Sequence, residues 1–140
     1  MKRLHRCLPV AMCVGLASSV ALADWLRIDH AAAQNTEHHL NMATVKQTGP
    51  MSIYRQVQVL TQGAAVKKPS VASVVSLYEY DCMSAKWRML ESAGFSLPWG
   101  EGDKVVLSAR SASAPDWQTL PDTALGQPVV DLLCPSGKDD

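Results

Sequence analysis

The stretch SLYEYDCMSAKW, residues 76–87, carries the strand pattern and the cysteine on which the fold depends. Side chains alternate across a β-strand, so Tyr78, Tyr80 and Cys82 are expected on one face. A tight turn directly after the cysteine would return the chain as a second, antiparallel strand through Trp87. The stretch therefore predicts a hairpin with one aromatic face, and it raises the question of which residue pairs with Cys82.

Residues 1–23 have the features of an export signal peptide. A basic start is followed by an apolar run rich in small residues, and Ala21-Leu22-Ala23 matches the small-x-small pattern before a cleavage site. We expect the mature chain to begin at Asp24 and to contain no integral membrane segment. The alternatives are an uncleaved membrane anchor, whose apolar run Pro9 interrupts, and lipidation at Cys13, which follows a large methionine instead of a small residue.

Removal of the signal would leave two cysteines, Cys82 and Cys134, in a chain exported to an oxidising compartment. No C-x-x-C motif is present, which argues against a thioredoxin-type redox pair. A zinc site would need two further ligands, and no metal-ligand spacing links the histidines to these cysteines. We therefore predict a structural Cys82–Cys134 disulfide and no cofactor.

The size and charge of the mature chain limit its function. It would have 117 residues, which suits one domain with a modest core. The signal carries three of the 13 basic residues and none of the 13 acidic ones, so the mature net charge is −3. A mildly acidic chain without a basic stripe is a poor match for nucleic acid.

Periodicity predicts an antiparallel α+β domain. Short segments with alternating side chains are joined by turns, and the spacing of Leu125, Val129, Leu132 and Leu133 indicates a helix face close to the C-terminus. Thr123 is a candidate N-cap, with the stable helix beginning near Gln127. Strands are expected at 24–29, 36–42, 51–60, 71–82, 85–92 and 104–109, with loops at 61–70 and 97–103 and a short extended piece at Trp117.

Few residues suggest chemistry, and we expect no enzyme. Glu79 and Asp81 share a strand face, where a solvated pair is the expected state and acid–base work the alternative. The adjacent His38 and His39 should point to opposite faces of a strand; with His30 nearby they are candidates for weak metal or haem contact. Candidate partner contacts are Phe95 and Trp99, which bracket a Gly/Pro-rich loop, and the basic pair Lys67 and Lys68; Trp25, Trp87 and Trp117 are expected in the core.

Several motifs together resemble the surface-adhesin protein E-like domain family of Gram-negative bacteria. They are DW at 24–25, YEYDC at 78–82 with a basic hairpin return, and Trp117 shortly before LLC at 132–134. The likeness covers nearly the whole mature chain, so we assign residues 24–140 to one such domain. It implies a curved antiparallel sheet with the C-terminal helix held on its concave face by a disulfide.

The resemblance also supplies the functional hypotheses. It implies a non-catalytic cell-envelope or surface protein that binds host matrix or plasma glycoproteins. It also implies that two copies can form a homodimer, and it associates haem with the family. The alternatives are a soluble periplasmic protein that binds haem or a metal, and a general envelope factor without a ligand. Fold alone does not choose among these functions.

Overall fold

The structure is a computed structural model and describes residues 24–28 and 35–135. The predicted signal peptide, residues 1–23, and His30 lie outside the described residues. None of the helices in the described part has the length and apolar character needed to cross a membrane. The elements in chain order are β1 (Trp25–Ile28), β2 (Thr36–Thr48), the 3-10 turn η1 (Pro50–Ser52), β3 (Tyr54–Gly63), β4 (Ser73–Asp81), β5 (Lys86–Leu97), the 3-10 turn η2 (Pro98–Gly100), β6 (Glu101–Ser108), β7 (Gln118–Thr119) and α1 (Gln127–Leu133).

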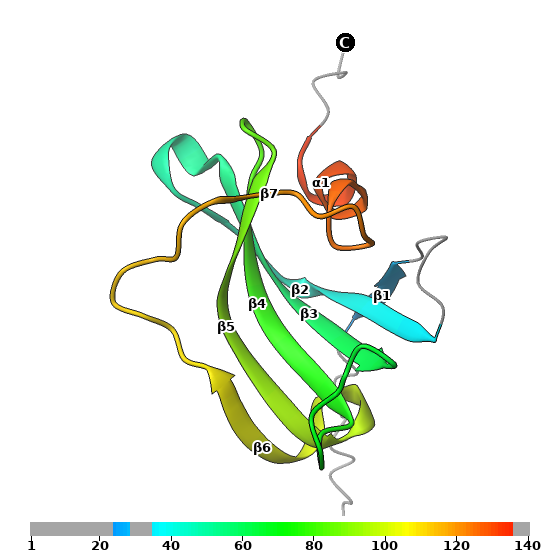
Figure 1. Ribbon diagram of the computed structural model, residues 1–140. Helices are drawn as coiled ribbons and strands as arrows, with labels where there is room; N and C mark the ends of the chain where they lie inside the picture. Colours follow the sequence, from blue (N-terminus) through cyan, green and yellow to red (C-terminus); the bar gives the residue numbers. More distant parts are fainter. Residues whose placement is uncertain (1–23, 29–34, 136–140) are drawn as a thin grey trace, which may run out of the picture.

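The strands form one antiparallel sheet in the order β1-β2-β3-β4-β5-β6, and the short β7 pairs with the start of β5. Each strand lies beside its sequence neighbour because every connection among β2–β6 is a short turn or loop. The sheet curls into a half-barrel, and α1 lies on its concave face (Figure 1). The predicted α+β fold is confirmed.

The core lies between α1 and the sheet face that we call the helix face. Register places Tyr78 and Tyr80 opposite Met89 and Trp87, and beside the buried Val57 in β3. These side chains pack on a short segment that includes the helix. Its buried members are Ala124, Leu125, Val129, Val130 and Leu133.

Two specific bonds hold the helix to the sheet. The Cys82–Cys134 disulfide joins the end of β4 to the C-cap of α1, with a Cα–Cα distance of 5.5 Å. The buried Tyr80 hydroxyl donates to the Leu125 carbonyl at 2.7 Å. The predicted disulfide is confirmed, and the face assigned to the two tyrosines is correct.

The strand boundaries differ from those predicted, mainly because irregular geometry extends some strands and shortens others. A bulge between Asn41 and Lys46 lets β2 continue to Thr48. The predicted strand 51–60 begins only at Tyr54, because Pro50 and Gly49, at φ +75°, build a tight turn before it. In addition, β3 runs to Gly63, β4 begins at Ser73, β5 runs to Leu97, and β6 begins at Glu101 within the predicted loop.

Three predictions about the helix and the tryptophans are wrong in part. Leu132 is 50% exposed, because the seven-residue helix turns Val130 inward in its place. Gly126 is the N-cap, while the Thr123 hydroxyl accepts the Leu125 N–H in the preceding turn. Among the tryptophans, Trp87 packs on the core, whereas Trp25 and Trp117 are half-buried outside the core cluster.

Candidate functional site

The sheet face opposite α1, which we call the outer face, contains the residues that the sequence left unassigned. Cross-strand register arranges β3, β4 and β5 into rows of neighbouring side chains on this face. Beside the terminal row Tyr54–Asp81–Lys86 at the β4–β5 turn lies the row Gln56–Glu79–Arg88. The next rows along the face are Gln58–Leu77–Glu91, Leu60–Val75–Ala93 and Gln62–Ser73–Phe95.

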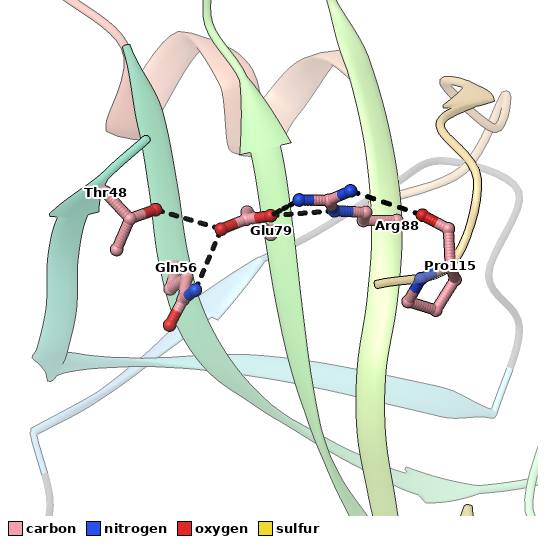
Figure 2. Close-up of polar contacts among 5 residues, drawn as sticks. All are labelled: Thr48, Gln56, Glu79, Arg88 and Pro115. Atoms are coloured by element: carbon pink, nitrogen blue, oxygen red, sulfur yellow. Dashed lines mark hydrogen bonds and ion pairs between the residues drawn. The ribbon is translucent and has the colours of Figure 1, made fainter. Parts of the chain in front are cut away.

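In the row Gln56–Glu79–Arg88, the central carboxylate of Glu79 is buried and hydrogen-bonded (Figure 2). Glu79 is 4% exposed and accepts hydrogen bonds from Thr48 Oγ1 at 2.9 Å and Gln56 Nε2 at 2.8 Å. Its second oxygen accepts both Nε and Nη2 of Arg88, the first at 2.7 Å. Four donors from three strands therefore satisfy the two oxygens of this charge.

Arg88 also binds the segment that follows β6. We call residues 109–117 the strap, because they run along the outer face before the chain reaches β7 (Figure 1). Arg88 Nη1 donates to the Pro115 carbonyl at 3.3 Å, and its guanidinium lies 4.0 Å from the Trp117 ring centroid. Trp117 in turn contacts Tyr54, with 4.9 Å between ring centroids. The ion pair therefore connects the sheet to the strap.

The electrostatics show that Glu79 is held in its ionised form. Burial raises the pKa of this carboxyl, but the hydrogen bonds from Gln56, Arg88 and Thr48 and the Arg88 charge outweigh burial and lower it. Asp81 behaves differently: its oxygens accept from Ser84 and the Met83 N–H in the β4–β5 turn. The expectation of a solvated Glu79–Asp81 pair is wrong, because Glu79 is buried by its neighbours and the strap. Asp81 is only half-buried and lies at the turn.

The far end of the outer face is covered by η2. Trp99 lies edge-on against the buried His39, with 4.8 Å between ring centroids. The Ser73 hydroxyl donates to the Leu97 carbonyl at 2.6 Å and accepts the Gly100 N–H at 3.0 Å. Trp99 nevertheless remains 47% exposed, so its ring both packs on the sheet and faces solvent.

The sheet edge beside η2 is open. β6 is the last strand in the sheet order, and no strand of the described chain pairs with its outer side. All of its residues except Ser108 are exposed, including Val105, Val106 and Leu107. Exposed aliphatic side chains on an edge strand are unusual, because unpaired backbone groups and apolar surface together invite association.

The four predicted partner-contact residues lie at one end of the sheet. Phe95 and Trp99 lie at the η2 end of the sheet, and Lys67 and Lys68 are exposed in the β3–β4 loop at that same end. The loop is held there by the Ala72 N–H, which donates to the Phe95 carbonyl at 2.8 Å. These four residues thus belong to one end of the molecule, as Figure 1 shows for their elements.

The two histidines are separated by the sheet. His38 faces the helix side, where its Nδ1 lies 2.9 Å from Thr61 Oγ1, and His39 faces the outer side against Trp99. Burial and the neighbouring His39 lower the pKa of His38, so its ring is neutral at neutral pH. Haem contact at either histidine stays a prediction, and the pair does not converge on one ion.

The sequence does not indicate that Arg88 and Trp117 lie together or that β6 is exposed. Alternation within residues 85–92 places Arg88 on the face opposite Trp87 and Met89, and the register with β4 puts it beside Glu79. Nothing in the local pattern indicates that Trp117 covers the arginine. The open edge is equally invisible, because strand order depends on which strands pair.

The fold and these surfaces define a class: an antiparallel half-barrel with a disulfide-linked helix on its concave face and an exposed edge strand, β6. The model of the family described as surface-adhesin protein E matches residues 25–135. The chain therefore belongs to the surface-adhesin protein E family, as its motifs predicted. Comparison with curated proteins and with solved structures gave no significant match.

Proposed function

We propose that this protein is an exported, non-catalytic envelope or surface protein that binds macromolecular partners through the open edge of its sheet. The observation that carries the proposal is β6, an edge strand with Val105, Val106 and Leu107 exposed. An extended segment of a partner protein could hydrogen-bond to such an edge while its side chains meet these aliphatic groups. Family membership supports adhesin-like binding. Host matrix or plasma glycoproteins are the partner class that we propose.

Neighbouring groups extend this surface. Leu97 and Trp99 in and beside η2 are exposed, and an aromatic ring that is partly packed and partly exposed is a common anchor at protein interfaces. Lys67 and Lys68 in the adjacent loop would favour acidic or sulfated groups on the partner. The binding surface thus combines a backbone edge, an aromatic anchor and a basic loop.

The binding test uses purified protein and a panel of immobilised host matrix and plasma glycoproteins. We expect Val106→Lys to reduce binding to any glycoprotein that the wild type binds, because it places a charge at the centre of the apolar strand. Trp99→Ala should reduce it as well. The control is Leu132→Lys, which places the same charge at an exposed leucine on α1. Equal binding by Val106→Lys and wild type would contradict the proposal.

Two further measurements separate the alternatives. Protease added to intact cells should digest a surface protein, whereas full protection would place the protein inside the envelope. Light scattering tests whether the edge binds a second copy: a dimer that Val106→Lys converts to monomer would assign β6 to self-association and not to a host partner.

A further inference from the structure

Between the strap and η2, the outer face contains a groove of about 330 Å³. Its apolar lining comes from three strands: Val75 and Leu77 in β4, Ala93 and Phe95 in β5, and Val106 in β6. None of these five side chains is fully buried, in contrast to the valines beneath α1. The volume lies at the lower end of the range for small-molecule sites.

Each end of the groove has one basic side chain, and among the described residues only one of the two is in an ion pair. At the strap end, Arg110 is paired with Glu91 at 3.6 Å. At the η2 end, Lys104 stands opposite Phe95 and takes part in no ion pair within the described chain. Glu91 neutralises Arg110 and repels a second anion, so an incoming negative charge is attracted to Lys104.

The dimensions indicate a slender ligand. The lining extends along β5 from Glu91 to Phe95, and these four residue steps correspond to about 13 Å at ~3.3 Å per residue. The uncharged polar residues of the lining are Gln58, Ser92 and Ser108. A groove with five apolar side chains from three strands in its lining, and at one end a cation that takes part in no ion pair within the described chain, complements one apolar chain that ends in one anion.

We propose that this groove binds an anionic amphiphile, with its acyl-type chain along Val75, Leu77 and Ala93 and its carboxylate or phosphate at Lys104. The lining contains no His, Cys, Met or Tyr side chain, so this site differs from a haem site with an axial protein ligand. It shares Val106 with the proposed partner surface, but Ala93 and Lys104 belong to the groove alone. Variants at Ala93 and Lys104 therefore test the groove separately from the partner surface.

The test is titration of the full mature protein with dodecanoate below its critical micelle concentration, followed by calorimetry and by amide chemical shifts. Dodecyl phosphate is the second probe, which separates a carboxylate from a phosphate source. We expect saturable binding of at least one of these anions, with shifts at Ala93 and Phe95. Dodecyltrimethylammonium, which has the same chain and opposite charge, should bind much more weakly.

Variants then locate the site. Lys104→Glu should weaken anion binding by about fivefold to tenfold, since it replaces an attractive charge by a repulsive one. Lys67→Glu makes the same change in the loop and should bind like wild type. Ala93→Leu, which adds bulk to the floor, should weaken binding of the chain while thermal melting shows that the protein is folded. The proposal is wrong if neither anion binds, if the cationic probe binds equally well, or if the two lysine variants behave alike.

Discussion

The helix face and the outer face of the same sheet are stabilised in different ways. On the helix face, Tyr78, Tyr80 and Val57 are buried under α1, and the contact is mostly apolar. On the outer face, a charged cluster around Glu79 closes one end and Trp99 covers the other, with an open groove between them. One face therefore supplies the core, whereas the other is closed only in places and keeps surface available for binding.

The comparison shows how one C-terminal segment serves both faces. The strap binds the outer face through Arg88, β7 passes the start of β5, and α1 then covers the helix face. Because the segment ends in Cys134, the disulfide limits its freedom on both sides of the sheet.

The largest effect is expected from removing the disulfide. Cys82→Ser with Cys134→Ser frees a link between residues 52 positions apart, and the chain-entropy model predicts a loss of about 4 kcal/mol in the free energy of unfolding. Urea denaturation of the oxidised wild type and the double variant measures the loss. Met83→Ser, an exposed change next to Cys82, is the control. A loss below 1 kcal/mol would show that α1 docks without its staple.

A slightly smaller loss is expected on the outer face. Glu79→Gln leaves Arg88 without its charge partner under the strap, and breaking a buried pair in this way costs about 3 kcal/mol. The matched control is Glu37→Gln, which breaks the exposed Arg27–Glu37 pair between β1 and β2 and should cost less than about 1 kcal/mol. Equal losses in the two variants would mean that burial under the strap does not strengthen the Glu79–Arg88 ion pair.

The hydrogen bond across the core can be removed almost without changing shape. Tyr80→Phe leaves the buried Leu125 carbonyl without this donor, and we expect a loss of about 1–2 kcal/mol. Since the ring remains, packing against Trp87 should be preserved. Tyr54→Phe, which changes a half-buried tyrosine on the outer face, is the control. A Tyr80→Phe protein as stable as wild type would assign the helix contact to packing alone.

The stability of the outer face should depend on pH, because this face contains the buried carboxylate of Glu79. The pKa of Glu79 is lower in the folded state than its ordinary value, so its contribution is fully present above the unfolded pKa and is lost as pH falls through the folded pKa. Wild-type stability should therefore fall in acid more steeply than that of Glu79→Gln. Melting temperatures between pH 7 and pH 3 give the two slopes; parallel curves would contradict this role for Glu79.

Much of the helix face could be predicted from the sequence, and much of the outer face could not. Alternation places Tyr78, Tyr80 and Cys82 on one side of a strand whatever its neighbours are, and that prediction is correct. The exposure of Glu79, in contrast, depends on whether a distant segment covers it. The same limitation explains Leu132, which the helical period assigned to the buried face and the short helix leaves exposed.

The sequence by itself determined the alternating strands, the aromatic face of residues 76–87 and the pairing of Cys82 with Cys134, because local periodicity and the number of available thiols set these. Tertiary structure alone decided that Arg88 lies between Glu79 and Trp117, that β6 is an open edge and that a groove separates strap from η2. These features depend on the curl of the sheet and on the path of residues 109–117 across it. Contacts between segments distant in the chain leave no periodic trace in either segment, so only the folded arrangement reveals them.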